Sequence, residues 1–199
     1  MKILIVSDTE SNYIWDHFDK NRFKDIDCVI SCGDLKAKYL SFLVSMLNVP
    51  LYYVHGNHDE SYVKEPPQGC VSIDDDLIHF KGLTIAGLGG SPVYRRGVFQ
   101  FSERQMAKRV AKLRKKLKKA GHLDIWVTHS PARDLGDGQD HAHIGFQCFR
   151  DFVDDLRPTF HLHGHQHLNY GRSERLISHG PTTIINGHGY YILDVDEPA

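Results

Sequence analysis

The chain has 199 residues, of which 41% are hydrophobic and 11% aromatic. This length can bury one sizeable core and is short for two, so we expect a single domain over residues 1–199. The formal net charge of -1 gives no electrostatic reason to expect a nucleic-acid or membrane partner. The hydrophobic run that begins at Ile3 ends before Ser7, too early for a membrane span or a signal-peptide core, and we therefore expect a cytoplasmic protein.

Hydrophobic runs rich in β-branched residues alternate with helical patterns along the chain. The first run, 2–6, predicts a buried strand because it is short, continuous and bounded by Ser7 and Asp8. Similar runs predict strands at 27–31, 51–54, 77–80, 83–86, 124–128, 159–163, 182–185 and 190–195. Helical patterns cover 11–18, 35–47, 102–120 and 146–156. A β-α-β-α start followed by a strand-rich middle and end predicts an α/β architecture.

The helix predicted over 102–120 has the clearest boundary markers. Ser102 and Gln105 have the spacing of a capping box, and Gly121 follows the last helical residue. A hydrophobic stripe runs along the helix at Met106, Val110, Leu113 and Leu117. Because the helix is amphipathic, we expect its many lysines to form a solvated face rather than a nucleic-acid site.

Cysteine and histidine usage bear on metal binding. The four cysteines form no CxxC pair, so we expect reduced thiols rather than disulfides or a zinc quartet. The 14 histidines exceed what ordinary packing needs, and many stand beside glycine or aspartate. A metal site is therefore worth seeking.

Five polar clusters directly follow predicted strands. They are Ser7-Asp8-Thr9-Glu10, Cys32-Gly33-Asp34, His55-Gly56-Asn57-His58-Asp59, His129-Ser130 and Gly164-His165-Gln166-His167. Because the carboxyl ends of strands in an α/β sheet share one edge, the fold should bring these clusters together. Carboxylates and imidazoles are ligands that Mn²⁺, Fe and Zn²⁺ accept, and there are more candidates than one ion can use. The clusters therefore predict two metal ions. The alternative, which we disfavour, is that these residues only shape the turns after the strands.

These clusters resemble the motifs of the calcineurin-like metallophosphoesterase superfamily, which run DxH, GD, GNH followed by D or E, a lone His, and GHxH. Here the same order reads DTE, GD, GNHD, His129 and GHQH, from Asp8 to His167. The small size is similar to compact bacterial phosphoesterases, and parts of the chain look like cyclic-nucleotide phosphodiesterases of this superfamily. The resemblance implies an α-β-β-α sandwich of two mixed sheets flanked by helices.

The resemblance also implies a role for each motif residue. One metal would be held by Asp8, the residue at position 10, Asp34 and His167. The other would be held by Asp34, Asn57, His129 and His165, with Asp34 bridging the two. A water or hydroxide between the metals would attack phosphorus. His58 would face the substrate, stabilising the transferring phosphoryl group or protonating the leaving oxygen, and Asp59 would orient its imidazole.

One position departs from the family pattern. Where DxH has histidine, this chain has Glu10. A glutamate can ligate metal through oxygen, but it adds a negative charge where the family has a neutral ring. We therefore expect an oxygen-rich site that prefers Mn²⁺, with Fe, Mg²⁺, Zn²⁺ or Ni²⁺ as further candidates, and we predict that Glu10 ligates the first metal.

Other residues allow two interpretations each. Tyr94 and Arg95 follow a glycine-rich turn and are candidate substrate contacts, because an arginine fork suits a phosphate; an exposed loop is the alternative. His141 and His143 are candidates to line the site, and a solvated loop is the favoured interpretation. His161 and His163 share one face of a predicted strand, where packing or support of the site is expected rather than metal binding.

We expect a hydrolase of phosphomonoesters or phosphodiesters, with nucleotides or cyclic nucleotides among the candidate substrates. The alternative is a non-catalytic metal-binding scaffold that acts through protein-protein interaction, since the retromer subunit built on this fold shows that such domains serve in protein assembly. A nuclease is a third hypothesis, which the near-zero net charge disfavours. The fold alone does not decide between these functions.

Overall fold

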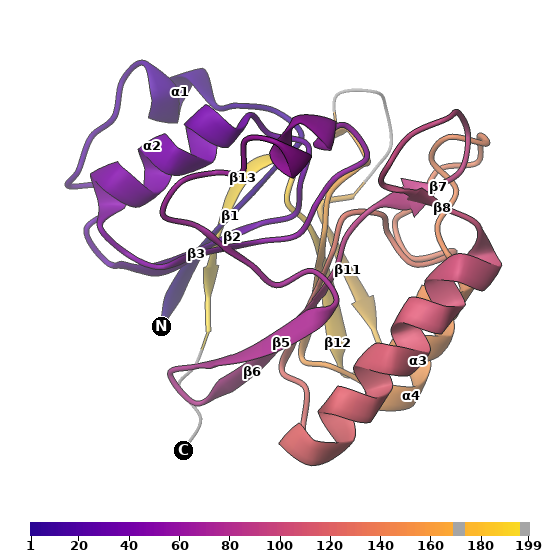
Figure 1. Cartoon of the computed structure of the whole chain (residues 1–199). Helices are drawn as coiled ribbons and strands as arrows, with labels where there is room; N and C mark the ends of the chain where they lie inside the picture. Colours follow the sequence, from indigo (N-terminus) through magenta and orange to yellow (C-terminus); the bar gives the residue numbers. More distant parts are fainter. Residues whose placement is uncertain (169–173, 196–199) are drawn as a thin grey trace.

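The computed structural model describes residues 1–168 and 174–195. Within these ranges two mixed β-sheets face each other, with α1 (Asn12–Trp15) and α2 (Ala37–Leu47) on the outside of one, and α3 (Glu103–Ala120) and α4 (Gln147–Leu156) on the outside of the other (Figure 1). This is the expected α-β-β-α sandwich. No helix in these ranges is both long enough and apolar enough to cross a membrane.

The first sheet contains the start of the chain as an inner strand. Its strand order is β13 (Gly189–Asp194), β1 (Lys2–Ser7), β2 (Ile26–Ser31), β3 (Leu51–Tyr53) and β4 (Val71–Ser72). The strands β1 to β4 pair in parallel, whereas β13 pairs antiparallel with β1.

The second sheet has a parallel centre and antiparallel edges. Its order is β11 (Leu176–His179), β12 (Thr182–Asn186), β10 (Phe160–His163), β9 (Ile125–Thr128), β6 (Leu83–Leu88) and β5 (Asp76–Phe80). The edge strands β11 and β5 pair antiparallel with their neighbours. A short parallel pair, β7 (Ser91–Pro92) and β8 (Gln100–Phe101), lies apart from both sheets.

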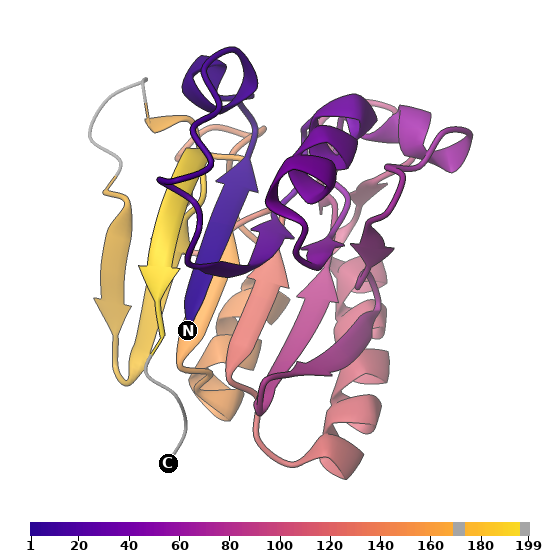
Figure 2. The same cartoon turned by 90° about the vertical axis from the view of Figure 1, so that its left-hand side faces the viewer.

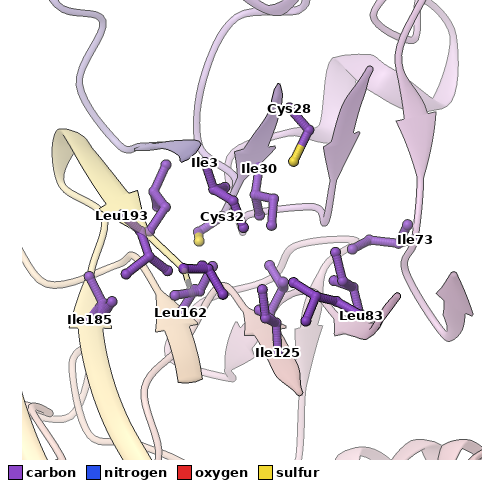
Figure 3. Packing of buried hydrophobic residues seen from close by; sticks show 14 of the residues in the cluster. Ile3, Cys28, Ile30, Cys32, Ile73, Leu83, Ile125, Leu162, Ile185 and Leu193 are labelled. Carbon is purple, nitrogen blue, oxygen red and sulfur yellow. The ribbon is translucent and has the colours of Figure 1, made fainter. Parts of the chain in front are cut away.

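Side-chain alternation along β1 explains the layers. Ile3 and Ile5 belong to the core between the sheets, together with Ile125 and Leu162 of the second sheet (Figure 3). Leu4 and Val6 point to the opposite face and belong to the cluster that α2 covers. Because successive strand residues face opposite ways, a continuous hydrophobic strand buries both faces.

The helices cover the outer faces as the sequence patterns predict. The helix α3 begins at the Ser102 capping box, and its predicted stripe packs with α4 against the second sheet. The helix predicted over 11–18 is wrong in length: α1 ends after Trp15, and Asp19 instead accepts a hydrogen bond from the Asn21 amide in a turn. Five short elements are not predicted by the sequence patterns: β4, β7, β8, β11 and the 3-10 helix η1 (Glu60–Val63).

Candidate metal centre

The predicted clusters lie at the edge where parallel strands of both sheets end. The arrowheads of these strands point the same way in both sheets (Figure 2). Two contacts join the sheets there: the His165 amide donates to both carboxylate oxygens of Asp8 at 3.0 Å, and His129 Nε2 lies 3.3 Å from Asp34 Oδ2. The fold therefore brings together motifs that are far apart in sequence.

The backbone at this edge takes conformations that most residues avoid. Asp8, Asp34 and His165 have φ angles of 63°, 58° and 66°, in the left-handed region. The two turns of the first sheet also touch: a Cβ on Gly56 would lie 2.0 Å from Asp34 Oδ1, and one on Gly33 would lie 2.3 Å from the Gly56 nitrogen. Only glycine allows this approach, which explains the GD and GN pairs of the sequence.

Three ionisable side chains converge on one point. Ligand atoms of Asp34, His129 and His165 lie within 4.8 Å of one another. Among residues 1–168 and 174–195, this is the one group of three or more His, Cys, Asp or Glu side chains whose ligand atoms lie that close. Asn57 adds a neutral oxygen, with its Oδ1 3.0 Å from His129 Nε2. The second metal-binding set implied by the resemblance is thus gathered in one place.

The hydrogen bonds of the two imidazoles fit a metal site. His129 Nδ1 donates to the Cys32 carbonyl at 2.8 Å, which leaves Nε2 to face Asp34 and Asn57. His165 Nε2 donates to the Ala142 carbonyl at 2.7 Å, which leaves its Nδ1 as the ligand atom. Metal-binding histidines commonly donate their other N–H to a carbonyl in this way, because it fixes the tautomer and the ring orientation.

The electrostatics favour a cation. Burial alone would raise the pKa of Asp34 and lower that of His129, but their attraction prevails and moves the two pKa values to about 2 and about 9. Burial lowers the pKa of His165 to about 3, so this imidazole is neutral and keeps a lone pair. A divalent ion would take the place of the proton on His129, since metal ligands bind in their deprotonated form.

The first predicted metal-binding set is less closely gathered. Glu10 Oε1 lies 3.6 Å from Lys36 Nζ, and the His167 ring lies 4.9 Å from the ring of His188. Within the described ranges, Asp8, Glu10 and His167 form no group with ligand atoms as close as those of the second set. Metal binding by Glu10 therefore stays a prediction.

A cleft of about 420 Å³ opens beside this centre. It is lined by Asp8, Thr9, Glu10, Asp34, Leu35, Lys36, His58, Asp59 and Ser61. It holds both acidic and basic groups and reaches Asp34, the carboxylate that the two predicted metal-binding sets would share. A small polar ligand would fit it.

His58 and Asp59 do not form the expected pair. The Asp59 carboxylate is buried, and its Oδ2 accepts the amides of Gly56 at 2.7 Å and Asp34 at 2.9 Å. His58 Nδ1 instead lies 2.7 Å from a guanidinium nitrogen of Arg95, while its Nε2 lies 4.0 Å from Asp34 Oδ2. Asp59 thus holds the two turns rather than the imidazole.

Two contacts of the site were not anticipated. The loop that carries Tyr94 and Arg95 reaches the motif itself: the Tyr94 hydroxyl accepts from Asn57 Nδ2 at 2.9 Å, and Arg95 contacts His58. His188 is nearly buried, and its Nε2 lies 3.1 Å from the Thr9 hydroxyl. His188 follows β12 as the predicted ligands follow their strands, so its position was a usable indication.

Comparisons with known proteins show the family and the fold of the chain. A family model described as calcineurin-like phosphoesterase matches residues 1–169. The UPF0046 protein K07C11.7 of Caenorhabditis elegans is 24% identical over 211 residues, which cover 94% of this chain and 69% of that protein. TT1561 of Thermus thermophilus shares the fold with a TM-score of 0.61 and 14% identity over 94% of this chain and 88% of its own. Another crystal structure has a TM-score of 0.65 and 13% identity over 97% and 94% of the two chains. Because the family model covers most of the sequence, the chain belongs to the calcineurin-like phosphoesterase family.

Proposed function

We propose that the protein is a dinuclear metal-dependent hydrolase of phosphate esters. The observation that carries the proposal is the convergence of Asp34, Asn57, His129 and His165 at the edge shared by both sheets. Their carboxylate, amide and imidazole atoms are donors that divalent transition metals accept. Family membership supports the same chemistry.

In this proposal Asp34 belongs to two sites. Asn57, His129 and His165 would complete one of them, and Asp8, Glu10 and His167 the other. The metals, with Mn²⁺ preferred, would supply an activated water as the nucleophile and neutralise the phosphate oxygens. His58 stands with Nε2 near Asp34 and would donate to the phosphoryl group or to the leaving oxygen.

The cleft supports a small phosphate ester as the substrate. Lys36 and His58 line it, and Arg95 contacts His58 from the neighbouring loop. The cations of Lys36 and Arg95 and an imidazole N–H are donors that stabilise phosphate oxygens. We propose phosphomonoesters or phosphodiesters, nucleotides among them. Tyr94 and Arg95 lie beside the site through their contacts with Asn57 and His58, where they would either bind the substrate or position the groups that do.

The test is metal-dependent turnover. We expect nitrophenyl phosphate or bis(nitrophenyl) phosphate to be hydrolysed in Mn²⁺ and not after chelation. Asp34→Asn should abolish turnover and reduce bound metal, because both sites share this carboxylate. Asp25→Asn, a substitution of an exposed aspartate that lines no part of the cleft, is the matched control and should behave like the wild type.

Metal counting also tests the role of Glu10. We expect elemental analysis to find about two Mn²⁺ per wild-type chain and about one in Glu10→Ala, with Glu10→His raising Zn²⁺ affinity. Unchanged metal content in Glu10→Ala would remove Glu10 from the ligand set.

The scaffold hypothesis remains the alternative because Glu10 lies near Lys36. A wild-type protein that binds metal, hydrolyses neither ester in any divalent metal and forms a stable complex with another protein would support it.

A further inference from the structure

The loop between β7 and β8, residues 93–99, is held against the candidate centre. Gln100, only 7% exposed, accepts the backbone amides of Tyr94 and Arg95 through Oε1, each at 3.1 Å. The Tyr94 hydroxyl accepts from Asn57 at 2.9 Å, and the Arg95 guanidinium carbon lies 5.6 Å from the Tyr94 ring centroid. Backbone and side-chain contacts therefore direct Arg95 towards His58.

The contact between Arg95 and His58 determines where the imidazole proton lies. A guanidinium has donors and no acceptor, so His58 Nδ1, 2.7 Å away, must accept. The ring proton is then on Nε2, the nitrogen that lies 4.0 Å from Asp34 Oδ2. The amide of His58 also donates to Asp34 Oδ1 at 2.7 Å, which limits the positions that the ring can take.

This arrangement is the reverse of a carboxylate-histidine pair. A carboxylate on Nδ1 would place the proton there and leave Nε2 as an acceptor. The one carboxylate next to His58 in sequence, Asp59, is occupied by the amides of Gly56 and Asp34. Arg95 is instead the partner of His58 Nδ1, and because a guanidinium only donates, it imposes the opposite tautomer.

We propose that Arg95 is a positioning residue that holds His58 as the Nε2–H tautomer, so that His58 acts as a hydrogen-bond donor towards the phosphate ester. This deepens the proposed function and rests on it. The competing interpretation is that Arg95 binds the substrate directly and touches His58 only in its absence. The two interpretations differ in whether the effect of Arg95 depends on His58.

The tautomer is measured first, without any turnover. ¹⁵N NMR of the Zn²⁺-loaded, ¹⁵N-labelled protein should show His58 with an unprotonated Nδ1 and a protonated Nε2. Arg95→Ala should give a mixture of tautomers, and Arg95→Lys should restore the single form because an ammonium also only donates. Arg96→Ala removes the same charge from the same loop and should match the wild type. A protonated Nδ1 in the wild type, or an unchanged spectrum in Arg95→Ala, would overturn the proposal.

The second measurement is a double-mutant cycle on an aryl phosphate series. Arg95→Ala and His58→Ala should each lower kcat for phenyl phosphate about tenfold more than for nitrophenyl phosphate, because the poorer leaving group needs the donated proton more. In the His58→Ala background, the further substitution Arg95→Ala should lower kcat by less than about twofold. An equal cost in both backgrounds would show direct substrate binding and contradict the proposal. If the wild type hydrolyses no ester, the proposed function fails, and the NMR spectra still decide the role of Arg95.

Discussion

At the scale of single residues, Asp59 shows how a motif position can serve the backbone. Its Oδ2 accepts two backbone amides, one from each of the turns that carry Gly56 and Asp34. Burial and the charge of Asp34 raise the pKa of Asp59 to about 6. The carboxylate therefore serves as a hydrogen-bond acceptor for the two turns, although burial and the nearby Asp34 disfavour its charged form.

This role predicts a difference between two substitutions. Asp59→Asn keeps an oxygen acceptor and removes the repulsion from Asp34, so we expect kcat to fall by less than about tenfold. Asp59→Ala leaves both amides without this acceptor, that of Gly56 in a buried position, and should destabilise the fold by about 2–5 kcal/mol, measured by urea unfolding. If Asp59→Asn instead lost several orders of magnitude in kcat with unchanged stability, Asp59 would be the orienting partner of His58 after all.

At the scale of elements, a largely buried ionic network ties α3 to both sheets. Asp74 accepts from His55 Nδ1 at 2.7 Å and from the Gly89 amide at 2.7 Å, and it pairs with Arg109 of α3. Arg109 also donates to the Gly89 carbonyl at 2.7 Å and lies 4.4 Å from the Phe101 ring centroid. Burial alone would raise the pKa of Asp74, but His55 and Arg109 outweigh it and the pKa is lowered.

Removing Arg109 should therefore cost much more than removing another charge of the same helix. Arg109→Met leaves Asp74 buried without its cation, and we expect the free energy of unfolding to fall by roughly 3 kcal/mol. Lys112→Met, at an exposed position of α3, is the matched control and should stay within about 0.5 kcal/mol of the wild type. Equal effects of the two substitutions in urea unfolding would show that the network contributes little.

Elements that bury continuous hydrophobic runs were predictable from the sequence, and those held by distant contacts were not. The strand that carries Ile3 and the helix stripe that includes Met106 follow local patterns. The edge strand β11 has only partly buried residues, so its sequence shows no clear run. The candidate ligands were predictable because each stands at the end of a strand, whereas the contact from Arg95 to His58 spans 37 positions and has no local pattern.

At the scale of the whole molecule, the candidate centre joins the two sheets. The first sheet supplies Asp8, Asp34 and Asn57, and the second supplies His129 and His165. The core between the sheets therefore sets the spacing of the candidate ligands. The same second sheet also buries histidines that bind no predicted metal, and these couple the stability of the fold to pH.

His161 should make the stability of the protein depend on pH. Thr128 Oγ1 donates to the Ser130 carbonyl at 2.7 Å, so it accepts from His161 Nε2 at 2.9 Å, and His161 Nδ1 has no hydrogen-bond partner in the described part of the chain. Burial, helped by His163, lowers the pKa of His161 well below 6.5. The unfolded chain therefore binds a proton that the native state excludes. The contribution of His161 to the free energy of unfolding is fully present above about pH 6.5, and it is lost as the pH falls further, by about 1.4 kcal/mol per pH unit.

The substitution His161→Phe tests this contribution, because phenylalanine keeps a ring against Trp126 and binds no proton. Between about pH 6.5 and about pH 5, the free energy of unfolding of His161→Phe should fall less steeply than that of the wild type, by about 1.4 kcal/mol per pH unit. If the free energies of unfolding of the two proteins, measured by urea unfolding, changed with pH at the same rate across this range, His161 would be protonated in the native state.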